Sequence, residues 1–236
     1  MPISDKIEIK QLDMELNGGC NYKCLMCPQA DGRERDFLKK LPFKVFTKVV
    51  DDAMQYGLDT VSLHGSGEPT LNKNIPKFVK YVKDKGLKCI SFTNGYKLTA
   101  EMSRQLIQAG IDVLRISCIG YDQKSYARWM SSGGYQKVRE NVKYFVDLNQ
   151  KMGGKSEVHI HHLITDINNK EQEINDYRKN WSNYTGAKSE IWLMHNWAGS
   201  EIELGYHREA LTANFDNRRS CGRPFSPLLQ VRAGGL

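Results

Sequence analysis

Strand-like and helix-like segments alternate along most of this 236-residue chain. The first strand pattern places Leu12, Met14 and Leu16 at alternate positions, which gives an extended segment one apolar face. Strands that are each followed by a helix imply a parallel sheet with helical crossovers. Further strands are expected at 60–64, 89–93, 112–117, 158–164 and 190–194, and helices at 43–54, 75–82, 102–107, 138–146 and 171–180.

Two architectures fit this alternation, an open doubly wound sheet and a barrel. A complete eight-unit barrel usually needs about 250 residues, whereas the alternation here ends near residue 200. We therefore expect an α/β fold in which residues 1–200 form an incomplete parallel (βα)6 TIM-like barrel. In either architecture, functional residues gather at the carboxyl ends of the strands.

The last part of the chain, residues 201–236, breaks this pattern. It is polar and irregular up to residue 220, and a short strand-like run, Leu228 to Val231, follows. The chain ends on Gly-Gly-Leu directly after that run. We expect residues 201–236 to be the start of a second, small domain that continues past Leu236.

Three of the six cysteines form a C-x3-C-x2-C array, Cys20, Cys24 and Cys27, in the segment 17–42, which we expect to be a long loop. The array is one ligand short of the four thiolates that close an iron–sulfur cluster. Structural zinc sites usually take four ligands in two separated pairs, and no second pair or finger-spaced histidine follows. Six cysteines are also too few for a disulfide scaffold of this length. Chance clustering in a loop is the remaining alternative, and we interpret the array as an iron–sulfur site.

Other polar segments fall at the ends of the expected strands. Gly65-Ser66-Gly67-Glu68-Pro69 follows the second strand, Thr93-Asn94-Gly95 ends the third, and Ser117 ends the fourth. Because the strands are expected to be parallel, these segments and the cysteines should meet at one edge. The sequence therefore predicts a single functional site at that edge.

The cysteine array after a first strand, with Gly-Ser-Gly-Glu-Pro after the second, resembles the radical S-adenosylmethionine (SAM) enzymes from about residue 9 to residue 195. The resemblance implies that Cys20, Cys24 and Cys27 hold three irons of a [4Fe–4S] cluster and that SAM chelates the fourth. It also implies reductive cleavage of SAM and abstraction of a hydrogen atom from a substrate. The electron would come from a one-electron reductant such as flavodoxin or ferredoxin.

The same resemblance implies several contacts to SAM. Backbone carbonyls near Ser66 and Gly67, together with the Glu68 carboxylate, are expected to accept hydrogen bonds from the SAM ammonium group. Met26 lies before the third cysteine, where the family often has an aromatic residue, and is expected to pack against the adenine. The alternative role of Glu68 is a loop cap or a salt bridge.

Three further SAM contacts are expected at the barrel mouth. Ser117 is placed to bond the ribose hydroxyls or the SAM carboxylate, and Asn94 lies beside it at the mouth. Arg128 follows a segment similar to the family's fourth-strand exit, and its guanidinium suits the SAM carboxylate. The alternatives are an ordinary strand-end serine, an ordinary Asn-Gly turn and a surface arginine.

Cys221 lies beyond the barrel. The run Cys221-Gly222-Arg223-Pro224 resembles the entry to a SPASM or twitch extension, whose cysteines hold auxiliary iron–sulfur clusters. The resemblance implies that Cys221 ligates such a cluster, and the alternative is a free or structural thiol.

The remaining histidines and cysteines have structural interpretations. His159, His161 and His162 share one strand, where side chains alternate between two faces, so they cannot form a metal trio. We interpret His162 as a packed residue. Cys89 and Cys118 are expected to be small buried residues. The sequence names no catalytic acid, base or radical-quenching residue.

The net charge of +7 comes from 34 basic and 27 acidic residues that are spread along the chain. Without a concentrated basic run, a nucleic-acid partner is not expected. No run of about 18 apolar residues predicts a membrane span, and the N-terminus lacks an apolar signal core, so we expect a cytoplasmic protein.

The resemblance favours an enzyme of the SPASM/twitch group that acts on a peptide or protein side chain, or on a small molecule. A radical SAM methyltransferase or RNA-modifying enzyme is the second interpretation. From a different class, an iron–sulfur electron carrier or a zinc-stabilised binding scaffold is the third.

Overall fold

A computed structural model describes residues 7–27, 30, 36–194 and 227–233. A parallel sheet of seven strands forms its centre, with strand order β8-β7-β6-β5-β4-β1-β9. The strands are β1 (Gln11–Met14), β4 (Thr60–Leu63), β5 (Lys88–Thr93), β6 (Val113–Ser117), β7 (Glu157–Ile164), β8 (Lys188–Leu193) and β9 (Leu228–Val231).

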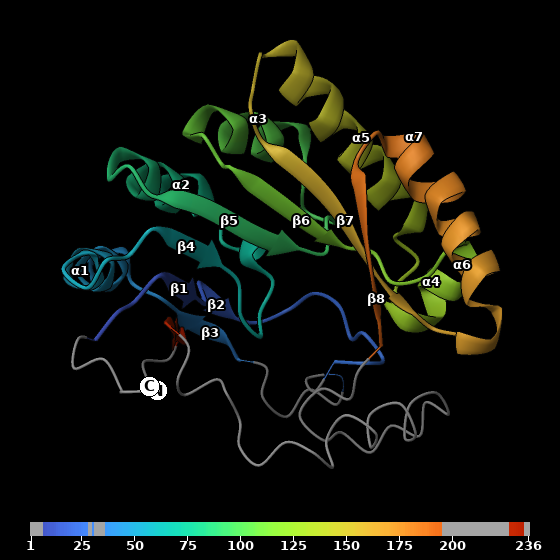
Figure 1. Ribbon diagram of the computed structural model, residues 1–236, viewed down its shortest axis with the longest axis horizontal. Coiled ribbons are helices and arrows are strands. Elements are labelled where there is room, and N and C mark those ends of the chain that lie inside the picture. The colour runs from blue at the N-terminus through green and yellow to red at the C-terminus, as the bar shows by residue number, and fades with distance from the viewer. Residues whose placement is uncertain (1–6, 28–29, 31–35, 195–226, 234–236) are drawn as a thin grey trace, which may run out of the picture.

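The strand order decides between the two architectures that the sequence allowed. From β1 to β8 each new strand is added on the same side of the one before, whereas a doubly wound sheet reverses direction. Right-handed crossovers that all advance in one direction place every helix on one face. Figure 1 shows this arrangement, with the helices along one side of a curved sheet. The expected α/β fold with a partial TIM-like barrel is confirmed.

The helices occupy the expected positions, with one addition. Each connection between neighbouring sheet strands from β1 to β8 contains at least one of them, and α4 was not expected from the sequence. They are α1 (Phe43–Met54), α2 (Ile75–Asp84), α3 (Ala100–Ala109), α4 (Gln123–Trp129), α5 (Tyr135–Lys151), α6 (Lys170–Tyr177) and α7 (Asn183–Thr185), with a π-helical segment η3 (Arg178–Ser182) between the last two. None of the helices in this part of the chain is long and apolar enough to cross a bilayer.

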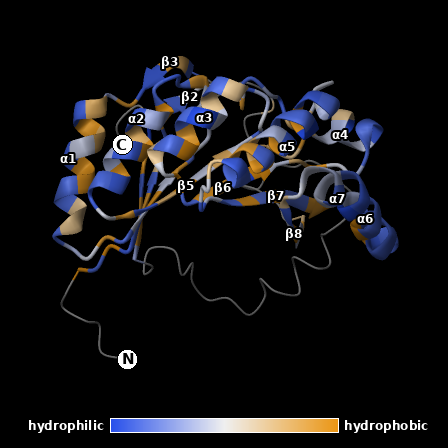
Figure 2. Cartoon of the chain, turned by 90° about the horizontal axis from the view of Figure 1, so that it is seen from above, coloured by the Kyte–Doolittle hydropathy of each residue, from blue (hydrophilic) through white to orange (hydrophobic). Residues whose placement is uncertain are grey.

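Helix α2 shows why these segments fold as helices. Ile75, Phe78, Val79 and Val82 recur at helical spacing, and all four are buried. Burial of each side chain of this size stabilises the fold by roughly 1.5–3 kcal/mol relative to exposure. The colouring in Figure 2 shows hydrophobic and hydrophilic residues alternating along α1, α3 and α5 in the same manner.

The two faces of the sheet differ in chemistry. Leu12, Val61, Leu114 and Ile160 are buried on the face that the helices cover. The opposite face mixes apolar residues such as Phe92 and Leu163 with polar ones. Among the polar ones, Arg115 Nε lies 3.1 Å from Glu190 Oε2, and His159 Nδ1 lies 2.8 Å from Glu190 Oε1. Ordinary TIM barrels fill this inner face with branched apolar residues, so these polar side chains are suited to a polar ligand.

The strand histidines divide between these faces as the alternation predicts. His162 is fully buried, its Nε2 lies 2.9 Å from Glu173 Oε1, and its ring stacks on Tyr177 at 4.3 Å. His161 is on the opposite face and contacts the Trp192 ring. Packing of His162, rather than metal binding, agrees with the sequence-based interpretation.

Two features depart from the sequence-based expectations. The segment 17–42 was expected to be a loop, yet β2 (Asn17–Gly18) pairs antiparallel with β3 (Asp36–Lys40). The sequence of β3 has no alternation of apolar and polar residues that would predict a strand. Its two neighbouring apolar residues, Phe37 and Leu38, are both exposed. The strand-like run at 228–231 is indeed a strand, but it pairs with β1 in the main sheet. The division into domains at residue 200 stays a prediction, since residues 195–226 lie outside the described ranges.

Candidate functional site

The cysteine loop, residues 18–27, begins where β1 and β2 end at the carboxyl edge of the sheet. The thiols of Cys20, Cys24 and Cys27 are partly exposed and form no disulfide. The backbone N–H of Cys27 donates to the carbonyl of Cys24 at 2.9 Å, which makes a tight turn between the last two cysteines. The loop therefore presents three reduced thiols at the edge where parallel α/β proteins place their sites.

Helix α4 packs against this loop. Leu25 N–H donates to the Trp129 carbonyl at 2.8 Å, and Cys24 Sγ lies 3.9 Å from the Met130 sulfur. The hydroxyls of Tyr22 and Tyr126 are 3.2 Å apart, and burial raises the pKa of Tyr22. Because Tyr126 also packs at 5.7 Å from the buried ring of Trp181, the loop rests on an aromatic core rather than on solvent.

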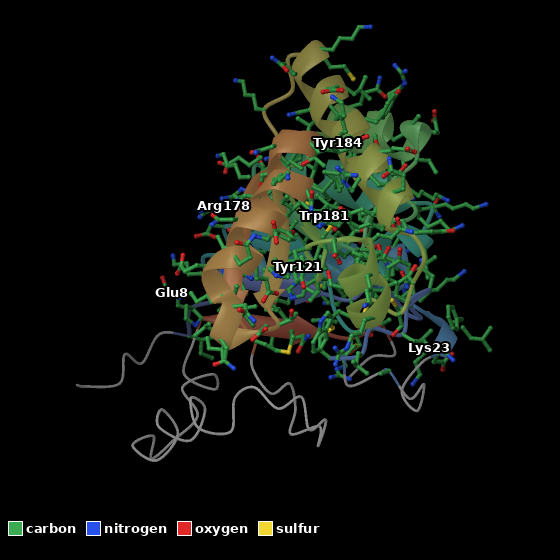
Figure 3. The ribbon with its side chains drawn as sticks, turned by 90° about the vertical axis from the view of Figure 1, so that its right-hand side faces the viewer. Glu8, Lys23, Tyr121, Arg178, Trp181 and Tyr184 are labelled. Atoms are coloured by element: carbon green, nitrogen blue, oxygen red, sulfur yellow. The ribbon has the colours of Figure 1, made fainter. Side chains whose placement is uncertain are left out.

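Figure 3 shows where the cysteine loop lies relative to the helices that follow it in the chain. Lys23, an exposed residue between Cys20 and Cys24, lies on one side of the molecule, whereas Arg178 lies on the other. Trp181 lies between the helices and is fully buried. The cysteine loop thus has one face on the aromatic core and one face open to solvent.

The glycine loop, residues 65–69, is hydrogen-bonded to the cysteine loop. Glu68 N–H donates to the Gly19 carbonyl at 2.8 Å, and Asn17 Nδ2 donates to the carbonyls of both Gly19 and Glu68. A Cβ added to Gly67 would lie 1.9 Å from the Asn17 carbonyl oxygen. Only glycine permits this approach, so the two loops form one unit.

The Glu68 carboxylate turns inward. It is 3% exposed, and its Oε1 accepts from the Thr70 and Thr93 hydroxyls, both at 2.6 Å, and from Thr70 N–H at 3.0 Å. Its Oε2 accepts from Asn94 N–H at 2.7 Å. Burial raises the pKa of this carboxyl, and the four hydrogen bonds oppose that effect. These contacts are those of the loop-cap alternative, and a bond to a SAM ammonium stays a prediction. Pro69 begins a short 3₁₀ turn (Pro69–Leu71).

Replacing Thr93 with valine is expected to lower the free energy of unfolding by about 2 kcal/mol. The hydroxyl donates to Glu68 and accepts from Gly95 N–H at 3.0 Å, so valine leaves two buried groups short of a partner. Urea unfolding measures the loss. Thr47→Val is the control, because its hydroxyl only bonds the Lys44 carbonyl on exposed α1, and its effect should stay within about 0.5 kcal/mol. Equal losses in the two variants would contradict the role of Thr93.

The other sequence-predicted residues are only partly brought together. Asn94 Nδ2 donates to Asn21 Oδ1 at 2.9 Å and lies 4.0 Å from Cys20 Sγ, so it is adjacent to the cysteine loop. Ser117 ends β6 and is partly buried. Arg128 is exposed on α4, with its guanidinium 5.3 Å from the Trp129 ring.

The other two sequence-predicted residues are Met26 and Cys221. Met26 is 8% exposed and packs in the core. Cys221 lies outside the described residues, so its role as an auxiliary-cluster ligand stays a prediction. The adenine contact of Met26 stays a prediction as well.

Two residues just before the cysteine loop, Glu15 and Asn17, make hydrogen bonds to the two loops that the sequence did not predict. Asn17 holds both loops, and Glu15 accepts from Ser66 N–H at 2.6 Å. The only local signal was their position, Glu15 near the end of the expected strand and Asn17 between that strand and a Gly-Gly pair. Helix α4 carried a clearer signal, a capping box between Asp122 and Ser125.

The three loop thiols are the ligand type that holds an iron–sulfur cluster, in which each thiolate binds a different iron. Burial raises the pKa of the Cys89 and Cys118 thiols, as expected for packed residues, and leaves the three loop cysteines as the accessible ligands.

Comparison with known proteins agrees with this site. The family model of the Radical SAM superfamily matches residues 14–176. A "Probable GTP 3',8-cyclase" of Methanococcus maripaludis is 26% identical over 141 residues, which cover 60% of this chain and 47% of that protein. The "Fe-coproporphyrin III synthase" of Methanosarcina barkeri is 31% identical over 101 residues, covering 43% of this chain and 25% of that protein.

The structural comparison finds the same fold. SuiB of Streptococcus suis, crystallised with its precursor peptide SuiA, superposes with a TM-score of 0.61 at 20% identity and covers 74% of this chain and 38% of SuiB. The chain spans about half the length, or less, of the curated relatives it matches. The family match covers most of the partial barrel, including all three loop cysteines and the glycine loop. The chain belongs to the radical SAM superfamily.

Proposed function

We propose that this chain is a radical SAM enzyme that cleaves SAM reductively and abstracts a hydrogen atom from a peptide or protein side chain. One observation carries the proposal: the cysteine loop, the glycine loop and Asn94 are joined by hydrogen bonds at the carboxyl edge of the sheet. Membership of the radical SAM superfamily supports the proposal, because enzymes of this superfamily use a [4Fe–4S] cluster and SAM as cofactors.

Different residues of this chain would bind the cluster and SAM. Cys20, Cys24 and Cys27 would hold three irons, and the glycine loop would hold the amino-acid end of SAM through backbone carbonyls of Ser66 and Gly67. When bound, the cluster supplies the electron for SAM cleavage, and cleavage supplies the oxidant for hydrogen abstraction. The aromatic core beneath the cysteine loop, with Tyr126 and Trp181 fully buried, excludes water from that side.

A peptide substrate is favoured by the inner face of the sheet. Its Arg115–Glu190 ion pair, together with the contact between Asp13 and His64 at 3.6 Å, brings hydrogen-bond donors and acceptors together. Amide-rich substrates offer both donors and acceptors in return. The fold likeness to SuiB, which binds a precursor peptide, is compatible with this class. The relatives named as GTP 3',8-cyclases make a small-molecule substrate the second candidate.

The proposal includes a one-electron reductant such as flavodoxin or ferredoxin. Lys23 projects from the open face of the cysteine loop, and Lys39 and Lys40 are exposed on β3, which pairs with β2 at the start of that loop. Such basic residues attract acidic electron carriers by long-range steering. A SPASM/twitch extension with Cys221 rests on its sequence motif alone.

The central test is product formation. The protein, reconstituted anaerobically with iron and sulfide, is expected to convert SAM to 5′-deoxyadenosine and methionine when a strong one-electron reductant is added. Liquid chromatography with mass detection measures both products, and a sample without reductant is the control. An assembled cluster that yields neither product would favour an electron carrier. One equivalent of zinc without iron would favour a binding scaffold.

A further inference from the structure

The side chain of Glu15 joins two segments that are distant in the sequence. Its Oε2 accepts from Ser66 N–H at 2.6 Å, and its Oε1 accepts from Ala233 N–H at 3.2 Å. Both donors are backbone amides, one in the glycine loop and one just after β9. Glu15 is 6% exposed, so these bonds form in a largely dry environment.

The position of β1 explains how one carboxylate reaches both segments. Strand β1 pairs with β4 on one side and with β9 on the other, and Glu15 directly follows it. Its own N–H donates to the Val231 carbonyl at 2.9 Å, so the backbone and the side chain of Glu15 are both attached to the β9 segment. A Cβ on Gly65 would lie 2.5 Å from Glu15 Cβ, so glycine is needed there for the close approach.

A buried carboxylate is costly unless its oxygens are hydrogen-bonded. Here each oxygen accepts from one backbone amide, and charge-assisted bonds of this kind are stronger than neutral ones. Packing alone would need no charge at this position, because an apolar side chain of similar volume avoids the cost of burying a carboxylate. The retained charge therefore points to fixing the orientation of the Ser66 and Ala233 amides, rather than to packing alone.

We propose that Glu15 is a positioning residue for SAM, which fixes the Ser66–Gly67 peptide and couples its position to the docking of β9. The inference rests on the proposed function, because it assigns SAM to the glycine loop. With its N–H bound to Glu15, Ser66 keeps one backbone orientation, which is the orientation offered to the amino-acid end of SAM. Because one carboxylate serves both segments, order in the glycine loop and order in β9 stabilise each other.

The coupling makes a reciprocal prediction. If docking of β9 favours SAM binding, SAM binding must favour docking of β9 to the same extent. Adding SAM to the reconstituted protein should therefore slow amide hydrogen exchange in residues 228–233. A Glu15 that only fills space would leave exchange in β9 unchanged by SAM.

Glu15→Gln is the direct test. The glutamine keeps the volume but has one acceptor oxygen, and its NH₂ group faces an N–H donor, so one of the two bonds is lost. The dissociation constant for SAM, measured by titration of the reconstituted protein, is expected to rise about tenfold while iron content stays unchanged. Ala233→Pro removes the second donor without touching the glycine loop. It should weaken SAM binding in the same direction by about threefold and provides the test should Glu15→Gln fail to fold.

Asp112→Asn is the matched control. Asp112 also accepts from a backbone amide, Cys89 N–H at 2.7 Å, and pairs with Lys83, but it precedes β6 at the amino edge of the sheet. This variant should lose stability and keep its SAM affinity within twofold. SAM affinity of Glu15→Gln within twofold of the wild type would overturn the positioning role, and unchanged exchange in β9 would overturn the coupling. A wild-type protein with an assembled cluster that binds no SAM would instead overturn the proposed function, and this inference with it.

Discussion

Replacing Cys24 with alanine is expected to remove the iron–sulfur cluster and, with it, cleavage of SAM. Cys24 is the middle ligand of three, and it is fixed by its contact with the Met130 sulfur and by the Cys27 N–H bond to its carbonyl. Two remaining thiolates hold a four-iron cluster poorly, because fewer than three irons then have protein ligands. Iron and sulfide analysis per chain, together with visible absorbance, measures the loss, and 5′-deoxyadenosine should fall to the level of the sample without reductant.

Cys89→Ala is the control for this prediction. Cys89 is fully buried in β5 and burial raises the pKa of its thiol, so it is unsuited to bind iron. The variant should keep full iron content while losing about 1 kcal/mol of stability from the small cavity. A Cys24→Ala protein that retains a SAM-responsive cluster would contradict the assignment of the cysteine loop.

Replacing Gly67 with alanine is expected to separate the two loops. The new Cβ would lie 1.9 Å from the Asn17 carbonyl oxygen and 2.8 Å from that of Gly19, and both are backbone atoms that cannot rotate away. Overpacking of this severity is expected to cost about 3 kcal/mol. It would also break the hydrogen bond from Glu68 N–H to the Gly19 carbonyl. Urea unfolding and SAM titration should both show large losses.

Gly133→Ala separates this effect from the general cost of replacing a glycine. No atom lies within 4 Å of a Cβ at Gly133, and its φ angle is not in the left-handed region. The variant should unfold within about 0.5 kcal/mol of the wild type and bind SAM normally. Similar losses in Gly67→Ala and Gly133→Ala would show that the close approach of the loops is not required.

Much of the fold was predictable because each barrel unit carries its own pattern. The alternation of Leu12, Met14 and Leu16, and the helical spacing of Ile75, Phe78 and Val82, are local consequences of burying one face of a strand or helix. The number and order of these patterns then imply a parallel sheet. The cysteine spacing was equally local, because three thiols in eight consecutive residues need no tertiary information to be recognised.

The supports of the site were not predictable in this way. Strand β3 has exposed apolar residues and no alternation, so its pairing with β2 was invisible in the sequence. The pairing of β9 with β1 joins residues more than 200 positions apart, and a four-residue run says nothing about its partner. The hydrogen bonds of the Glu68 carboxylate to Thr70, Thr93 and Asn94 also depend on segments that only the fold brings together.

The sequence by itself determined the family, the three candidate cluster ligands and the edge of the sheet at which they lie, because these depend on spacing along the chain and on the common direction of the strands. Only the tertiary structure decided which strand flanks β1, which helix supports the cysteine loop and which carboxylates accept hydrogen bonds from backbone amides. These depend on hydrogen bonds between segments that the sequence separates widely, such as Glu15 to Ser66 and Ala233. Such bonds form only once burial of the apolar faces has brought the strands together.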